Sequence, residues 1–363
     1  MENQSVYLPA LEVIIFIFGI FIFLYNTLCN RLNLKNTVMF LVVLIPSLIW
    51  ILFYDDVRYL LFKALSMLSV IYLSSKFPRQ LLFLLGFIAL TGFVLDDVQN
   101  HIFISKHVGQ NQNQVLTIPF LLICVTFFLT KDITDKYIII LYLVATLEFF
   151  MGLYFGVRNS CVIAMIFIMV LASRKIAKLF VKYGSLIPLI YILSLFISYK
   201  YYLTIDVDPL NINPSNIERS SMIYASLDSF FSYLLQGPGS NFDALASQAM
   251  TSVSSNLKIY SNEYGVDPHV FLLSLWRSVG SLITILWFIY WLYYWSLLRK
   301  IEPFIDDFKV RLYLALLAMA VVVFSLEPPS LAFRILVAVI MGVALSQIKT
   351  AAMKFNKYEV KEV

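Results

Sequence analysis

The sequence predicts an all-α protein that crosses a membrane about eleven times and has one large loop on the outer side of that membrane. Of its 363 residues, 60% are hydrophobic and only 13% are charged, and the mean hydropathy is +0.83. A soluble domain carries about twice that charged fraction and roughly 45–50% apolar residues. The chain is therefore predicted to lie mostly in lipid. Its basic residues lie in short loops between apolar runs, which is not a nucleic-acid-binding pattern, so we expect no nucleic-acid partner.

Apolar runs long enough to form spans recur along the whole chain. About 20 mostly apolar residues cross the ~30 Å hydrocarbon core of a bilayer, and flanking anchors allow somewhat fewer. The runs lie at residues 9–28, 37–54, 58–75, 80–95, 115–130, 137–156, 159–173, 184–203, 270–298, 311–326 and 331–348. The ninth is too long for one span, so we expect its first part to lie at the outer surface or to enter at a tilt. The count is therefore eleven or twelve.

Basic residues indicate which loops face the cytoplasm, because short cytoplasmic loops are enriched in Lys and Arg. The opposite loops here are acidic or neutral at their ends, as at Asp55–Asp56 and Asp96–Asp97. This asymmetry predicts an outer N-terminus and a cytoplasmic C-terminus. Eighteen of the 27 basic residues fall in alternate loops and in the tail: Arg31, Lys35, Lys76, Arg79, Lys131, Lys136, Arg174, Lys175, Lys178, Lys182, Arg299, Lys300, Lys309, Arg311, Lys349, Lys354, Lys357 and Lys361.

The chain is predicted to have four parts. These are eight spans in residues 1–203, an outer-loop subdomain at 204–268, three spans in 269–348 and a cytoplasmic tail at 349–363. The outer loop opens with a Pro- and Asn-rich stretch. Apolar residues then recur at helical spacing from Ile217 to Leu235. A tight turn is predicted at Gly237–Gly239, followed by a Ser- and Ala-rich stretch with few core residues. A second, polar outer loop runs from Asp96 to Gln114.

Several classes of chemistry lack their motifs in this sequence. It contains no P-loop, no Rossmann fingerprint, no Gly-x-Ser-x-Gly motif and no His-Glu-x-x-His. With only three histidines and no His-rich cluster at ligand spacing, we expect no metal and no cofactor. Cys29, Cys124 and Cys161 lie in or beside apolar segments, and their number and spacing fit neither a disulfide framework nor a zinc site.

Nine basic residues fall outside the cytoplasmic set: Arg58, Lys63, Lys106, Arg158, Lys200, Arg219, Lys258, Arg277 and Arg334. Arg158, Arg277 and Arg334 lie at or just inside the outer ends of apolar runs. An arginine near the bilayer centre costs about 2.5–3.5 kcal/mol on insertion scales, so such residues are candidates for function. The alternative is that each one extends to the outer interface, which relieves most of that cost. Converging guanidinium groups would suit a phosphate or diphosphate.

His269 stands where the large outer loop meets the ninth run. A histidine at an interface can act as a general base because its pKa starts near neutrality. The alternative is an ordinary surface histidine at the start of a helix. Its position about two helical turns before Arg277 favours the functional interpretation. Glu148, inside the sixth run, is expected to pair with an outer arginine or to be protonated, in a structural or electrostatic role.

Four stretches between Gly156 and Arg334 carry a family resemblance: Gly156–Ser160, Glu218–Ser220 with Leu234–Phe242, Asp267–Leu272 with Gly280, and Glu327–Arg334. They resemble motifs of the superfamily of bacterial O-antigen ligases and Wzy-type O-antigen polymerases. In order, these motifs are the Ser-Arg-Gly start of a transmembrane helix, the Arg-led periplasmic helix with its Gly-x-Gly-x-Phe turn, the Pro-His-Asn…Gly block, and the last outer loop with its arginine.

The chain departs from the family pattern at three places. Asn159 replaces the usual Gly after the arginine, and Val270 replaces the Asn after the histidine. Two residues, Ser240 and Asn241, separate Gly239 from Phe242 where the family has one. A ligase of this family typically has twelve spans, whereas about eleven are counted here.

The resemblance implies a GT-C-like fold in the bacterial inner membrane and a periplasmic active site for inverting, metal-independent glycosyl transfer. The donor would be a glycan on undecaprenyl diphosphate. The acceptor would be a lipid A–core sugar hydroxyl in a ligase, or a second lipid-linked repeat unit in a polymerase. His269 would be the base, with Arg158, Arg219 and Arg334 as catalytic residues that bind the diphosphate and Arg277 as a further ligand.

The Pro-His block favours a ligase, because many polymerases of this superfamily lack it, but the polymerase remains an alternative. A flippase or transporter of lipid-linked oligosaccharide is less favoured, since such carriers tend to have inverted repeats around a midplane site and none is evident here. A structural or receptor protein would not need arginines around a histidine.

Overall fold

The computed structural model describes four long stretches of the chain and a few isolated helical positions. These are residues 135–154, 158–205, 214–253 and 270–326, with positions 17, 38, 41–42, 44–47, 49, 69–73, 342 and 346. Within them every regular element is a helix, as the composition predicts. The predicted runs at 9–28, 80–95, 115–130 and 331–348 lie almost wholly outside the described residues, so the span count stays a prediction.

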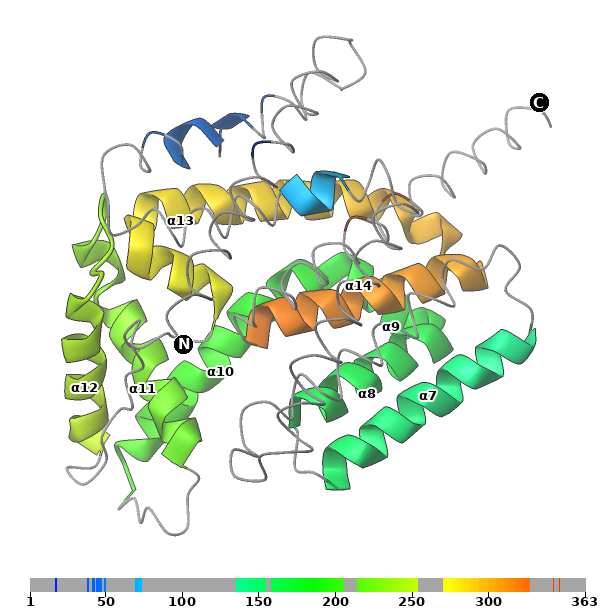
Figure 1. Cartoon of the computed structure of the whole chain (residues 1–363), viewed down its shortest axis with the longest axis horizontal. Coiled ribbons are helices and arrows are strands. Elements are labelled where there is room, and N and C mark those ends of the chain that lie inside the picture. The colour runs from blue at the N-terminus through cyan, green and yellow to red at the C-terminus, as the bar shows by residue number, and fades with distance from the viewer. Residues whose placement is uncertain are drawn as a thin grey trace, which may run out of the picture.

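Three apolar helices pack together in one half of the described structure (Figure 1): α7 (Asp135–Tyr154), α8 (Arg158–Ala172) and α14 (Phe308–Leu326). They match the sixth, seventh and tenth apolar runs. Every residue from Leu314 to Val322 is buried, so α14 is the central helix of the group. Alanines without exposed surface allow the three backbones to approach closely, namely Ala145, Ala164, Ala315, Ala318 and Ala320.

A basic amphipathic helix, α9 (Arg174–Tyr183), forms where the charge pattern alone predicts a cytoplasmic loop. It begins at Ser173, whose hydroxyl accepts a hydrogen bond from the Ile176 amide at 3.3 Å, as expected of an N-cap. Ala177, Phe180 and Val181 are buried at helical spacing, while the lysines face outward. The turn η3 (Gly184–Leu186) then leads into α10 (Ile187–Tyr202), the predicted eighth run.

The basic end of α13 (Phe271–Leu298) is fixed against α9 and η3 by side-chain donors. The indole Nε1 of Trp295 donates to the carbonyl of Val181 at 2.8 Å, and that of Trp291 donates to Ser185 at 3.1 Å. One turn further on, Arg299 donates to the carbonyl of Lys182 at 3.0 Å. These bonds join α13 and the start of η5 (Arg299–Phe304) to backbone carbonyls in the last turn of α9 and in η3.

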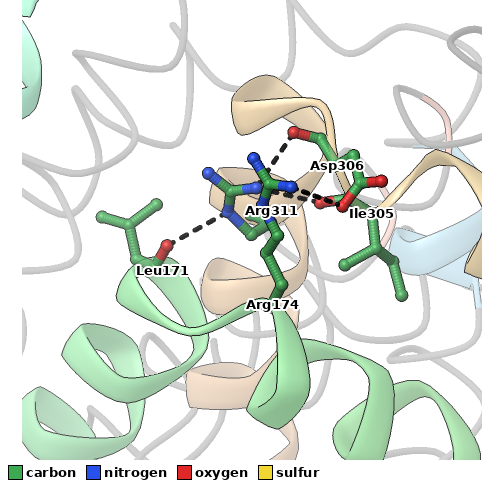
Figure 2. Close-up of polar contacts among 5 residues, drawn as sticks. All are labelled: Leu171, Arg174, Ile305, Asp306 and Arg311. Atoms are coloured by element: carbon green, nitrogen blue, oxygen red, sulfur yellow. Dashed lines mark hydrogen bonds and ion pairs between the residues drawn. The ribbon is translucent and has the colours of Figure 1, made fainter.

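Arg311 joins the end of α8 to the start of α14 (Figure 2). Its Nε donates to the carbonyl of Leu171 at 3.2 Å, and its Nη1 donates to the carbonyls of Ile305 and Asp306 at 3.1 and 3.0 Å. Beside it, Arg174 forms an exposed ion pair with Asp306 at 3.2 Å. Arg311, one of the predicted cytoplasmic cations, therefore binds three backbone carbonyls at once.

Two helical stretches among the described residues are long and apolar enough to cross a membrane, Arg174–Tyr202 and Phe271–Tyr293. Shorter apolar helices cover Ile139–Tyr154, Cys161–Ala172 and Val310–Val322. On α10, large apolar side chains are exposed along one side, at Leu189, Ile190, Leu193 and Ile197. Exposed aliphatic residues in such a row are typical of a lipid-facing helix surface.

Candidate functional site

The described part of the predicted outer loop contains two α-helices, α11 (Pro214–Asp228) and α12 (Asn241–Val253), which lie beside α10 and the start of α13 (Figure 1). The predicted helical pattern from Ile217 is confirmed as far as Asp228, where α11 ends before the predicted Leu235. The Ser- and Ala-rich stretch forms α12. It contributes four buried residues, more than its composition suggests: Phe242, Ala246, Ala249 and Met250.

One apolar cluster joins these helices, and its largest fully buried side chain is Trp276 of α13. The other members are Tyr199, Met222, Ala225, Phe242, Ala246 and Ala249. The hydroxyl of Tyr199, near the end of α10, donates to the carbonyl of Ala249 in α12 at 2.9 Å, and its ring stacks on Tyr224 of α11 at 4.2 Å. Helices α11 and α12 are therefore packed onto the ends of two candidate spans.

Helix α13 is broken at Gly280, whose φ of 79° and ψ of 178° are not helical. The sequence predicts a ninth run too long for one span, and the break divides it into a first half (271–279) and a second half (281–298). A break leaves the first amides of the second half without helical acceptors. The amides of Ser281 and Leu282 donate instead to the carbonyls of Tyr233 and Leu234, both at 3.0 Å.

Those carbonyls belong to the 230–239 loop, the segment from Phe230 to Gly239 that follows α11. Further donors from α13 fix the same loop. The indole Nε1 of Trp276 donates to the carbonyl of Phe230 at 3.2 Å, and the hydroxyl of Ser281 also donates to Phe230. The rings of Phe230 and Trp276 stack with centroids 5.9 Å apart. The loop is thus held across the break by both backbone and side chains.

The end of the 230–239 loop is the tight turn predicted at Gly237–Gly239. Gly239 has a φ of 56°, in the left-handed region. Gly237 lies so close to α13 that an added Cβ would be 2.1 Å from the carbonyl oxygen of Arg277. Only glycine allows the two backbones to approach this closely.

The side chain of Arg277 contacts both this turn and the start of α12. Its Nε donates to the carbonyl of Gly239 at 3.2 Å, its guanidinium carbon lies 5.7 Å from the ring centroid of Phe242, and its Nη2 is 3.7 Å from the Asp243 carboxylate. The side chain is 11% exposed. The side chain is therefore enclosed by contacts with Gly239, Phe242 and Asp243. A role in diphosphate binding stays a prediction.

The remaining predicted site residues are only partly described. Arg219 is half-buried in α11, between Glu218 and the fully buried Ser220. Arg158 is the first residue of α8, where only the backbone is described. His269 and Arg334 lie outside the described residues. The structure thus places Arg219 on α11 and Arg277 on α13, two helices that contact each other, while the convergence of Arg158, Arg219, His269 and Arg334 stays a prediction.

Searches against protein-family models, curated proteins and solved structures find no match. The family resemblance therefore rests on the sequence motifs alone. Among the described residues, no group of three or more His, Cys, Asp or Glu side chains could hold a metal ion. Glu148, on α7, is buried, with 8% exposure. Helix α7 packs mainly against α8 rather than against α11 or α12.

Two residues with structural roles at this site were not singled out from the sequence. Asp243 lies in the first turn of α12, where an acidic residue is favoured by the helix dipole, and it also pairs with Arg277. Ser281 directly follows the break and reaches carbonyls of the 230–239 loop. The signal for Asp243 was available, since an acidic residue soon after a Gly-containing turn indicates a helix start.

Proposed function

We propose that this protein is an O-antigen ligase, which transfers a glycan from undecaprenyl diphosphate to a sugar hydroxyl of the lipid A–core at the periplasmic face of the bacterial inner membrane. The observation that carries the proposal is the docking of the outer helices α11 and α12 onto the broken helix α13. This arrangement uses Gly237, Gly239 and Gly280, three glycines of the family-like stretches.

The chemistry of the proposed reaction needs a base and fixed cations. A sugar hydroxyl is a poor nucleophile, and a positioned base accelerates its attack by roughly 10²–10⁴-fold. We assign that role to His269, which takes the hydroxyl proton as the new glycosidic bond forms. The leaving diphosphate gains negative charge as its bond to the glycan breaks, and cations fixed near it stabilise the transition state. We assign that role to Arg158, Arg219 and Arg334, with Arg277 beside them.

Arginine suits this role for a physical reason. The guanidinium group keeps its charge at all accessible pH values and presents a planar fork of donors to phosphate oxygens. Burial against protein reduces the reorganisation needed when charge develops. Arg219 is partly buried against protein in this way. It is half-buried on α11, and the next two residues of that helix, Ser220 and Ser221, have no exposed surface.

The test is a gel of lipopolysaccharide from a deletion strain complemented with wild type, His269→Ala, Arg219→Ala and, as a matched control, Arg174→Ala. Arg174 is an exposed arginine at the start of α9, a helix that lies away from α11 and α12 (Figure 1), so its variant should restore a full ladder. Each variant is first checked for its level in the membrane. Loss of the ladder with polymer remaining on the lipid carrier, in His269→Ala and Arg219→Ala only, supports the ligase.

Two other results would redirect the proposal. Cores capped with a single repeat unit in the deletion strain would identify a Wzy-type polymerase, because ligation would then proceed without polymerisation. A full ladder from both His269→Ala and Arg219→Ala would exclude the assigned active site and would favour a transporter of lipid-linked oligosaccharide.

A further inference from the structure

The 230–239 loop, which begins with the short 3-10 helix η4 (Phe230–Ser232) and is otherwise irregular, exposes large apolar side chains. Phe231 is 76% exposed, Leu235 is 57% exposed and Leu234 is 48% exposed. The segment from Phe230 to Gly239 contains no charged residue. Adjacent exposed apolar residues of this size are typical of a surface that contacts a membrane, another protein segment or an apolar ligand.

This surface continues directly onto α13. The amide of Leu282 donates to the carbonyl of Leu234, so the two residues are neighbours. From Leu282 the exposed residues Ile285, Ile289 and Leu292 follow at helical spacing along the second half of α13. The stretch Phe271–Tyr293 is one of the two helices apolar enough to cross a membrane. The loop surface is therefore an extension of a candidate lipid-facing stripe.

The length of the second half of α13 sets the depth of the loop. From Leu298, which is followed by the basic Arg299 and Lys300, a helix rises about 26 Å to Ser281. The hydrocarbon core of a bilayer is ~30 Å thick. With the two basic residues at one water boundary, Ser281 and the loop paired with it lie near the opposite boundary.

Irregular backbone at that depth needs its polar groups satisfied by protein, because lipid offers no hydrogen bonds. The 230–239 loop meets this condition at three carbonyls. Those of Phe230, Tyr233 and Leu234 all accept hydrogen bonds from donors of α13. A loop that faced only water would not need these hydrogen bonds, because water would satisfy its carbonyls.

From these observations we propose that Phe230–Gln236 inserts Phe231, Leu234 and Leu235 among the acyl chains of the leaflet opposite Arg299 and Lys300. The partner is the bilayer itself. The insertion anchors the adjoining turn, with Arg277, at the level of the lipid head groups. It depends on α13 crossing the bilayer and not on glycosyl transfer, so either proposal can fail without the other.

The test uses single cysteines in the full-length protein after Cys29, Cys124 and Cys161 are replaced by serine or alanine. Phe231→Cys and Leu235→Cys report on the loop. Ser247→Cys, on an exposed position of α12, is the aqueous control, and Leu193→Cys, on the exposed apolar side of α10, is the lipid control. Phe231 and Leu235 are both exposed, so neither variant removes a buried side chain.

Each variant is reconstituted into vesicles of phosphatidylethanolamine and phosphatidylglycerol and treated with a membrane-impermeant maleimide. We expect the maleimide to label Ser247→Cys. We expect no labelling of Phe231→Cys, Leu235→Cys or Leu193→Cys. In a second measurement, a bimane fluorophore is attached to each cysteine under denaturing conditions before reconstitution. Lipids with a doxyl group near the head group should quench the bimane at Phe231→Cys and Leu235→Cys, but not at Ser247→Cys.

Two outcomes overturn the proposal. Maleimide labelling of Phe231→Cys and Leu235→Cys at the rate of Ser247→Cys would place the loop in water. Protection from maleimide without quenching by doxyl lipids would mean that the loop is covered by protein, either another part of this chain or a second copy.

Discussion

Arg277 and Gly239 exchange two hydrogen bonds: the amide of Gly239 donates to the carbonyl of Arg277 at 3.0 Å, and the Nε of Arg277 donates back to the carbonyl of Gly239 at 3.2 Å. The same arginine therefore holds the turn through its backbone and through its side chain. Its guanidinium continues to Phe242 and Asp243 at the start of α12. A residue that the charge pattern marks as a possible ligand thus also determines where α12 begins.

Replacement of Arg277 by lysine should destabilise the protein although the charge is kept. Lysine lacks the Nε donor and the planar face that lies over Phe242, so a hydrogen bond to a charged group worth about 1.5–3 kcal/mol is lost. The apparent unfolding temperature of the detergent-purified protein measures the effect. Arg174→Lys is the matched control, because Arg174 is exposed and its pair with Asp306 contributes little. Equal unfolding temperatures for both variants would contradict the structural role of Arg277.

Alanine should be tolerated much better at Gly239 than at Gly237, two residues away. At Gly237 the new Cβ would lie 2.1 Å from the carbonyl oxygen of Arg277 and 2.5 Å from that of Trp276. Backbone atoms cannot rotate away, so the turn must separate from α13. At Gly239 nothing lies within 4 Å, and only the left-handed φ adds a cost of about 1–2 kcal/mol. Thermal unfolding of the two variants side by side checks this order, and the reverse order would exclude the described turn.

Gly280→Ala should lower stability by more than Gly239→Ala, although both glycines have positive φ. The backbone of Gly280 lies in a region that is almost restricted to glycine, with a cost of about 1–3 kcal/mol for other residues. A Cβ there would also lie 2.8 Å from the carbonyl oxygen of Tyr233 and 2.9 Å from the amide of Gln236. Thermal unfolding is again the measurement. A variant as stable as wild type would indicate that α13 is a continuous helix.

Arg311→Met should loosen the junction of α8 and α14. Methionine keeps much of the aliphatic length but removes the donors to Leu171, Ile305 and Asp306. Carbonyls left without partners at a partly buried site each cost about 1–3 kcal/mol, less where water can reach them. Faster proteolysis near residues 172–174 and 305–307, relative to Arg174→Met, would be the expected result. Cleavage that is unchanged would contradict it.

Hydropathy predicts four of the described helices well, because a long apolar run in lipid has no alternative to a helix. The runs at 137–156, 159–173, 184–203 and 311–326 correspond to α7, α8, α10 and α14 within a few residues. Composition fails at α9, where four basic residues obscure the buried spacing of Ala177, Phe180 and Val181.

The site is less predictable, since its contacts join residues far apart in the sequence. The turn at Gly237–Gly239 is predicted because glycine and proline are local signals. The break at Gly280 is not, because the acceptors that permit it, Tyr233 and Leu234, belong to another segment. Arginine positions can be proposed from charge in an apolar context, but whether they meet depends on packing. Arg277 shows this, because its pairing with Asp243 follows from the fold of α12.

The broken α13 has a consequence for the order in which the protein is made. The ribosome synthesises Tyr233 and Leu234 before Gly280, so the carbonyls that complete the second half of α13 already exist when that half emerges. The helix that contains Trp276 can therefore dock on a finished α11–α12 pair instead of waiting for later sequence. Chains that stall or are truncated before Gly280 would leave the carbonyls of the 230–239 loop without their donors.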